Sequence, residues 1–198
     1  MLEKLFDRYQ IILASGSPRR QQFLKEANIP YRFQLFPVEE IYPPELQREE
    51  ITAYLSNLKS KPFDKILNDN ELVITSDTIV WHQDKALGKP KNTKDAVRML
   101  QQLSGDSHEV ITSISIKGKY FQEVVSDTTK VYFKKLSLTE ITYYIQNFKP
   151  FDKAGSYGIQ EWLGQIAVEK IEGSYTNVMG LPMHKLYEVL KNIEDSKM

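Results

Sequence analysis

Residues 72–81 (LVITSDTIVW) form the most strand-like segment of the chain. The segment is rich in β-branched residues, with Asn and Asp before it and His-Gln-Asp after it, and it therefore predicts a strand. Other strand patterns occur at residues 11–14, 31–36, 108–117, 120–133 and 166–171, and Gly118 joins the two longest of these. The chain is thus expected to form a sheet with several long strands.

Helical patterns separate these strands. Ser17 and Pro18 are typical of the N-cap and the first residue of a helix. A second helix is expected from about Glu49, after a loop at residues 38–47, and Pro62 ends or kinks it. Further helix starts are marked at Thr93, at Ser137 with its capping-box partner Glu140, and at Pro182. The pattern predicts an α/β protein whose mixed, twisted β-sheet is flanked by helices.

Charge and hydropathy exclude several classes of protein. The 198 residues include 26 Lys and Arg and 26 Asp and Glu, and this zero net charge argues against bulk nucleic-acid binding. The longest apolar run, residues 11–14, is far shorter than the ~20 residues of a membrane span, and the N-terminus lacks a signal-peptide pattern. We expect one cytoplasmic domain over residues 1–198, with two lobes around a central cleft and no membrane partner.

The metal-binding residue types are also restricted. The chain has no cysteine, and its three histidines (His82, His108 and His184) are widely spaced. This pattern disfavours thiolate and imidazole metal sites. Any metal is therefore expected to be a hard ion held by carboxylate oxygens.

Two segments carry candidate chemistry, one between a predicted strand and a helix and the other (residues 75–78) inside the strand predicted at residues 72–81. Residues 14–20 (ASGSPRR) combine small residues, a helix start and two arginines, which suits phosphate binding. The alternative is a capped helix whose Arg19 and Arg20 are solvated. Asp77 is out of place among β-branched residues, because a buried carboxylate must be paired, hydrogen-bonded or bound to a metal. The alternative is a carboxylate at a strand end that faces water.

Further charged residues fit the same chemistry. Lys89 lies between a glycine and a proline, on a turn that a hairpin would bring back towards Asp77. Glu40 lies in the loop before the helix that contains Lys59. Each of these alone is more often a solvated charge, but together with the two arginines they suit a polyphosphate that carries a divalent ion.

Two glycine-rich segments, residues 152–160 and 173–182, also contain hydroxyl and amide side chains. They predict ordered loops that line a cavity, with Gln160 able to pair with donors and acceptors on a base edge. The alternative is a pair of ordinary surface turns.

Six blocks of the sequence resemble the Maf family of nucleoside triphosphate pyrophosphatases. They occur in order, cover nearly the whole chain, and comprise residues 13–20 (LASGSPRR), 76–80 (SDTIV), 88–90 (GKP), 99–110 (MLQQLSGDSHEV), 152–160 (DKAGSYGIQ) and 171–182 (IEGSYTNVMGLP). One block would be a weak signal, whereas six in register are highly specific. The resemblance implies an ITPase-like fold and hydrolysis of a nucleoside triphosphate to its monophosphate and pyrophosphate, with Mg²⁺ or Mn²⁺.

The resemblance also implies roles for individual residues. Asp77 is expected to accept a proton from the attacking water and Glu40 to be a second catalytic carboxylate, with both holding the metal; which of them is the general base stays open. Lys59 and Lys89 are expected to bind phosphate. Expected substrate-binding residues are Ser15, Ser17, Arg19, Arg20, Thr78 and Gln160, of which Arg19, Thr78 and Gln160 match positions associated with substrate choice.

The substrate class follows from the same comparison of motifs. Gln160 and the SYTNVMGLP run resemble the subgroup that acts on dTTP and UTP, with modified pyrimidine analogues as further candidates, whereas the 7-methyl-GTP subgroup usually has Glu at this position. The sequence departs from the family around Lys59 (LSNLKS) and at Glu161-Trp162, where a glycine-rich pair is common. The family is often dimeric, so a homodimer is expected. The alternative function is a nucleotide-binding regulator of cell division with little catalysis.

Overall fold

Seven strands form one mixed sheet in the computed structural model, which describes residues 2–196. The strands are β1 (Gln10–Leu13), β2 (Tyr31–Phe33), β3 (Glu71–His82), β4 (Lys85–Leu87), β5 (Ser107–Lys117), β6 (Gln122–Phe133) and β7 (Val168–Glu172). Their order is β2-β1-β3-β5-β6-β7, and β4 pairs with β3 outside this path. Because β1 is parallel to β2 and β3, while β3–β4 and β6–β7 are antiparallel, the expected mixed sheet is confirmed.

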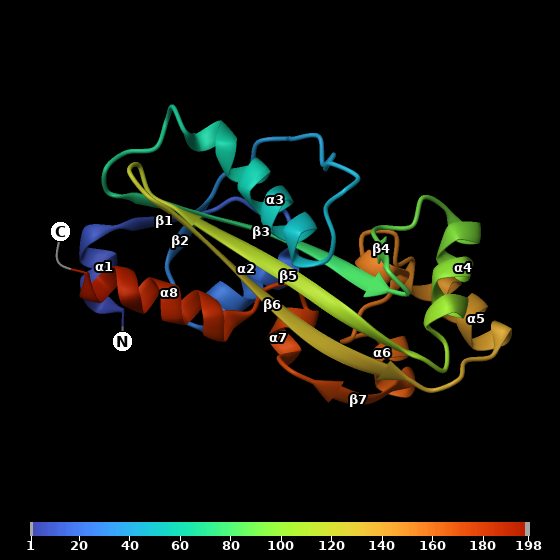
Figure 1. Cartoon of the computed structure of the whole chain (residues 1–198). Coiled ribbons are helices and arrows are strands. Elements are labelled where there is room, and N and C mark those ends of the chain that lie inside the picture. The colour runs from blue at the N-terminus through green and yellow to red at the C-terminus, as the bar shows by residue number, and fades with distance from the viewer. Residues whose placement is uncertain (1, 197–198) are drawn as a thin grey trace. The chain divides into compact units, whose positions relative to one another are not determined.

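Helices flank this sheet (Figure 1). They are α1 (Glu3–Arg8), α2 (Pro18–Glu26), α3 (Glu49–Ser60), α4 (Thr93–Leu103), α5 (Leu138–Phe148), α6 (Trp162–Ala167), α7 (Tyr175–Val178) and α8 (Met183–Asp195). Two short 3₁₀ helices, η1 (Lys61–Phe63) and η2 (Ala154–Ser156), complete the described elements. The fold class predicted from the sequence, α/β with a mixed sheet and flanking helices, is therefore confirmed.

The chain divides into two compact units. The first contains residues 2–77, 112–127 and 180–196 of the described chain, and the second contains residues 78–111 and 128–179. Strands β3, β5 and β6 contribute residues to both units. The single domain over residues 1–198 and the central cleft stay predictions.

In the first unit, strand β1 is buried on both faces. Ile11 and Leu13 belong to a core that also contains residues of α1, α2 and α8, whereas Ile12 packs in a second cluster with Phe63 of η1. This division follows from the strand itself, because successive side chains point to opposite faces. Figure 1 shows α3 over one face of β1 and β3, and α1 beside α8 over the other.

In the second unit, apolar residues of α4, α5 and α6 form a separate core with β3 and β6. Strand β4 turns back along β3, so that Leu87 pairs with Val80. The two turn residues, Gln83 and Asp84, have φ values of 48° and 56°, and positive φ at both central residues is the geometry that matches strand twist in a two-residue hairpin. The hairpin predicted between Asp77 and Lys89 is therefore present.

Several predicted boundaries are wrong, for local reasons. Strand β2 ends at Phe33 rather than at residue 36, because its neighbour β1 ends at Leu13. Ile166 belongs to α6 and not to a strand, since the buried Leu163 and Ala167 have helical spacing.

Two further boundaries move by one or two residues. Asn92 rather than Thr93 caps α4, and its side chain accepts a hydrogen bond from the Asp95 backbone at 2.9 Å. Strand β6 begins at Gln122 rather than at residue 120, because Phe121 closes the preceding turn by accepting a hydrogen bond from the Gly118 N–H at 3.0 Å. The capping box of Ser137 and Glu140 is confirmed.

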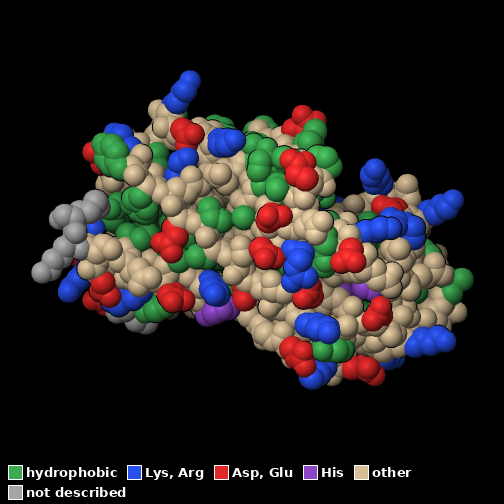
Figure 2. Space-filling model, in the orientation of Figure 1, with side chains coloured by type: hydrophobic (Ala, Val, Ile, Leu, Met, Phe, Trp, Pro, Cys, Tyr) green, Lys and Arg blue, Asp and Glu red, His purple; other side chains and the backbone are tan. Residues whose placement is uncertain are grey.

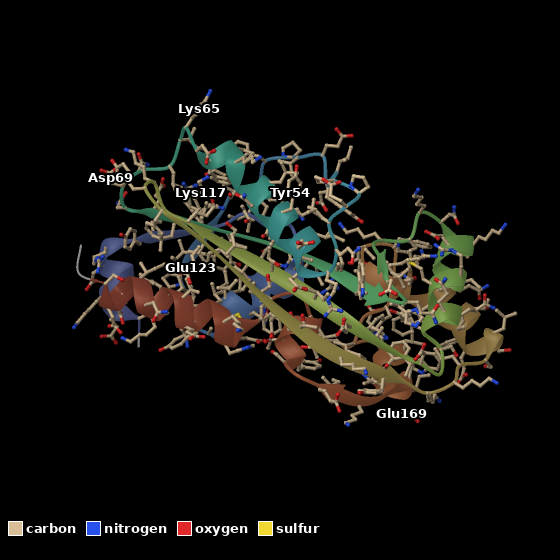
Figure 3. The ribbon with its side chains drawn as sticks, in the orientation of Figure 1. Tyr54, Lys65, Asp69, Lys117, Glu123 and Glu169 are labelled. Carbon is tan, nitrogen blue, oxygen red and sulfur yellow. The ribbon has the colours of Figure 1, made fainter. Side chains whose placement is uncertain are left out.

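Charged side chains of both signs are interspersed over the face shown in Figure 2. In the first unit, Lys119 pairs with Asp69 at 2.6 Å, and Lys117 of β5 pairs with Asp64. Lys117 and Asp69 are labelled in Figure 3. The Lys119–Asp69 pair is exposed on both sides and contributes little to stability, but both pairs balance charge locally. Across residues 2–196, the helices are too short or too polar to be membrane spans.

The second unit contains a buried imidazole. His108 lies 2.7 Å (Nε2 to Oη) from the hydroxyl of Tyr157, and its ring makes edge contacts with those of Phe133 and Tyr157. Burial lowers the pKa of His108 to about 3, and the nearby His82 adds to this effect. His108 is therefore neutral at physiological pH.

We expect His108 to make the fold sensitive to acid. Below pH ~6.5 the unfolded chain takes up a proton on this imidazole that the folded chain does not, so stability falls as the pH drops towards 3. The loss at pH 4.5 should be about 2–3 kcal/mol, measured by urea unfolding at pH 7 and 4.5. His108→Gln should remove this part of the pH dependence, whereas the control His184→Gln, at an exposed site, should retain it. Equal pH dependence in both variants would contradict the assignment.

Candidate active site

The loop after β1 lies beside the middle of β3. The two strands are parallel, with Leu13 opposite Ile74, and the Ala14 N–H donates to the Ile74 carbonyl at 2.9 Å. Ser15, the residue after Ala14, therefore continues along β3 in the direction of Ser76. Helix α2 then begins at Pro18 with Ser17 as its N-cap, although the Ser17 side chain makes no capping bond to the helix. The predicted loop between a strand and a helix start is confirmed.

Arg20 donates hydrogen bonds to three separate segments of the chain. Its Nε donates to the Gly180 carbonyl at 2.7 Å, and one terminal nitrogen donates to the Ser76 carbonyl at 2.8 Å and to the Ser15 Oγ at 3.1 Å. Removal from water lowers the pKa of Arg20 to about 10, against the opposing effect of the Asp77 carboxylate. The group thus stays cationic at neutral pH. The alternative of a solvated arginine is wrong for Arg20.

Arg19 lies in the same first turn of α2, half-buried, and its charge contributes to the lowered pKa of Arg20. Two cations therefore mark the start of this helix, where the unpaired N–H groups also favour an anion. Ser15 is buried and Ser17 is half-buried. The phosphate-binding role of residues 14–20 stays a prediction.

Lys59 bridges the two predicted catalytic carboxylates. Its Nζ lies 2.5 Å from Asp77 Oδ1 and 3.2 Å from Glu40 Oε1. The Asp77 side chain is 8% exposed, so the alternative of a carboxylate that faces water is wrong. Glu40 is 45% exposed and comes from the loop before α3. The structure therefore brings Glu40, Lys59 and Asp77 together from three distant parts of the sequence.

Hydroxyl groups fix the position of α3, which carries Lys59. Thr75 of β3 donates from its hydroxyl to the Ser56 carbonyl at 2.6 Å, and the hydroxyls of Thr52 and Ser113 lie 2.6 Å apart. These small side chains let the helix approach the sheet closely. Because Asp77 follows Thr75 by two residues and Lys59 follows Ser56 by three, the same contact directs the ammonium to the carboxylate.

Asp77 and Glu40 could together hold a divalent ion in the first unit. Across the described chain there is no cluster of three or more His, Cys, Asp or Glu suited to a metal. Two carboxylates, completed by the oxygens of a bound phosphate, are nevertheless a common set for Mg²⁺. The donors are hard oxygens and a cationic ammonium already lies between them, so this pair fits a divalent cation.

Lys89, Thr78 and Gln160 belong to the second unit. There, the Gly155 N–H donates to the Gly88 carbonyl at 3.1 Å, which joins the turn of Lys89 to the loop that leads to Gln160. Gly155 has a φ of 65°, and a Cβ there would lie 2.7 Å from Val80 Cγ2, so a larger residue would not fit. Lys89 and Gln160 are exposed and Thr78 is half-buried. The grouping of these residues with Asp77 stays a prediction.

Gly180 is a site residue that sequence reasoning missed. Its carbonyl accepts hydrogen bonds from Arg20 and, at 3.3 Å, from the Ser76 hydroxyl. Every residue has a carbonyl, so no side-chain type could have marked this position. The one signal available was a glycine within residues 173–182, and Gly180 does adopt a positive φ of 98°.

The whole chain is similar to known proteins. The family described as "Maf-like protein" matches residues 10–193. A protein of Flavobacterium johnsoniae named dTTP/UTP pyrophosphatase is 56% identical, covering 98% of this chain and 100% of its own length. A protein of Bacteroides fragilis with the same name is 47% identical, covering 94% and 97%.

A solved structure supports the fold alone. The Staphylococcus aureus Ham1 protein aligns with a TM-score of 0.52 and 18% identity, covering 92% of this chain and 98% of that one. This likeness agrees with the α/β architecture of the mixed sheet and its helices. The family match over residues 10–193 and the near full-length relatives together establish that the chain belongs to the Maf-like protein family.

Proposed function

We propose that this protein hydrolyses nucleoside triphosphates to the monophosphate and pyrophosphate, with dTTP and UTP as its substrates. The bridge from Lys59 to Asp77 and Glu40 carries the proposal, because it combines a candidate base with a cation for the phosphates. The name shared by the relatives from two bacterial genera supports the substrate class. Hydrolysis of modified pyrimidine analogues, which prevents their incorporation into nucleic acid, is part of the same proposal.

In this mechanism Asp77 accepts the proton of the attacking water. Strand β3 and Lys59 hold this carboxylate in place, whereas Glu40 lies on a loop and is more exposed, so we assign the base to Asp77 and a supporting role to Glu40. The water supplies the new oxygen, the anhydride bond between the α and β phosphates breaks, and pyrophosphate leaves.

Cationic side chains bind the phosphates. Lys59 and Lys89 are the proposed phosphate ligands, with Arg19, Arg20, Ser15 and Ser17 at the start of α2. A Mg²⁺ or Mn²⁺ ion held by Asp77 and Glu40 would neutralise charge on the triphosphate and polarise the phosphoryl oxygens. Because the chain has no net charge, attraction of the triphosphate must come from this local set of cations.

We further propose that the reaction takes place in the cytoplasm, where nucleoside triphosphates are made and used. The interspersed charges of the face in Figure 2 are in keeping with a small-molecule substrate rather than a nucleic acid. The homodimer implied by the family resemblance stays a prediction.

The function is tested by release of pyrophosphate. The purified protein is incubated with each common nucleoside triphosphate, modified pyrimidine triphosphates and 7-methyl-GTP, in Mg²⁺ or Mn²⁺, and pyrophosphate is converted to phosphate by an inorganic pyrophosphatase. We expect the highest kcat/KM for dTTP and UTP. Preference for 7-methyl-GTP would overturn the substrate class, and nucleotide binding without turnover would favour the alternative of a regulator of cell division.

Gln160→Glu should change base preference. Glutamine presents both a donor and an acceptor, whereas glutamate presents only acceptors when it is ionised, so a base that pairs with the amide loses one hydrogen bond. We expect kcat/KM for dTTP and UTP to fall about tenfold or more relative to the other triphosphates. Steady-state kinetics over the same set of substrates gives the ratio. A uniform loss for all nucleotides would show that Gln160 is structural.

A further inference from the structure

Gln160 occupies a corner of a tight turn in the second unit. The Glu161 N–H donates to the Gly158 carbonyl at 3.0 Å, which closes a four-residue turn with Ile159 and Gln160 at its centre. Gln160 is exposed. The backbone of the turn sets the position and direction from which the Gln160 side chain projects. The placement of its amide therefore depends on how rigidly the two ends of the turn are held.

One hydroxyl group holds both ends of the turn. The Gly158 N–H donates to the hydroxyl of Tyr144 at 2.9 Å, and that hydroxyl donates in turn to the Glu161 carboxylate. Tyr144 is fully buried in α5. Burial and the Glu161 carboxylate raise the pKa of Tyr144, so the phenol stays protonated and can donate.

The second carboxylate oxygen of Glu161 is also engaged. Lys153 Nζ lies 2.9 Å from Glu161 Oε1 and 2.7 Å from Asp152 Oδ1, and the Lys153 side chain is 10% exposed. A Cβ at Gly158 would lie 2.8 Å from Glu161 Cδ and 3.0 Å from Lys153 Cε, so the close packing depends on glycine. A partly buried ion pair thus reinforces the hydroxyl bridge.

The geometry points to Tyr144, Glu161 and Lys153 as positioning residues that set nucleotide selectivity by fixing the turn that carries Gln160. This inference rests on the proposed function. It also gives a role to Glu161, whose two carboxylate oxygens are engaged by Tyr144 and Lys153. A glycine there would supply no carboxylate for Tyr144 and Lys153.

Tyr144→Phe tests the inference, because it removes the bridging hydroxyl and keeps the ring. We expect kcat/KM for dTTP relative to dCTP to fall about tenfold, the factor equivalent to about 1.4 kcal/mol. The change should arise from a higher KM for dTTP with kcat nearly unchanged, since the proposed reacting groups, Asp77 and Lys59, are untouched. The control is Tyr143→Phe, the same substitution at the next residue, whose ring packs on Trp162 and whose hydroxyl takes no part in this network.

Glu161→Gln provides a second variant in case loss of the buried hydroxyl unfolds the protein. It leaves an oxygen for the Tyr144 hydroxyl and removes the charge that pairs with Lys153, so a smaller loss of the same ratio is expected. Thermal unfolding of each variant confirms that it is folded. An unchanged dTTP to dCTP ratio in both folded variants would overturn the inference, whereas a wild-type protein that releases no pyrophosphate would instead overturn the proposed function.

Discussion

Asp77→Asn is expected to abolish pyrophosphate release while nucleotide binding stays within about threefold of the wild-type affinity. Asparagine has almost the same shape as aspartate but cannot accept the proton of water, and general-base catalysis contributes about 10²–10⁴-fold to a rate. The substitution also removes the charge that lies 2.5 Å from Lys59 Nζ, which frees that ammonium for a phosphate and helps to preserve binding. We therefore expect kcat to fall by about 10³-fold or more.

Two measurements separate catalysis from binding in this variant. Single-turnover release of pyrophosphate gives the chemical step, and calorimetry with a non-hydrolysable dTTP analogue gives the affinity. Asp69→Asn is the matched control, since Asp69 is exposed and pairs with Lys119 in the same unit. Normal turnover by Asp77→Asn would remove Asp77 from the mechanism, and a comparable loss in Glu40→Gln alone would then assign the base to Glu40.

The sequence located the most informative position of the site because one residue broke a pattern. Asp77 is a carboxylate in a strand of β-branched residues, and the structure confirms that it is buried and paired. Such a conflict between local preference and residue type is expected at a functional site. Arg20 breaks no pattern and was predicted instead because two arginines follow a small-residue turn at a helix start.

Contacts that use the backbone were beyond prediction. Arg20 donates to the carbonyls of Ser76 and Gly180, and Thr75 donates to that of Ser56. These partners depend on how strands and helices meet in three dimensions, and no residue type reveals them. Lys59 lies between both carboxylates although the sequence around it departs from the family pattern.

Local propensity also fails where two structures compete for a short apolar run. Residues 166–171 were predicted to form a strand, but Ile166 is the last-but-one residue of α6. The buried Leu163 and Ala167 have helical spacing, and between them Gly164 packs so closely on the backbone that a Cβ there would lie 2.1 Å from the Ile159 carbonyl oxygen. Such close backbone packing cannot be inferred from hydropathy.

Lys59→Met is expected to lower kcat/KM for dTTP by about 10²-fold or more, because the transition state loses a cation that its phosphate charge requires. The same substitution should tighten Mn²⁺ binding in the absence of nucleotide by about tenfold. Without the ammonium, Asp77 and Glu40 are left as two neighbouring carboxylates whose repulsion a divalent ion relieves. In the wild type, Lys59 competes with the metal for these oxygens until a triphosphate offers the ammonium another partner.

Electron paramagnetic resonance of free Mn²⁺ measures this affinity directly, with and without a non-hydrolysable nucleotide. Lys61→Met is the matched control, since Lys61 is exposed and lies only two residues further along the chain. Wild-type kcat/KM in Lys59→Met would show that Lys59 is not a phosphate ligand. Weaker Mn²⁺ binding than in the wild type would show instead that the ammonium holds the two carboxylates in place, and competition between Lys59 and the metal would be wrong.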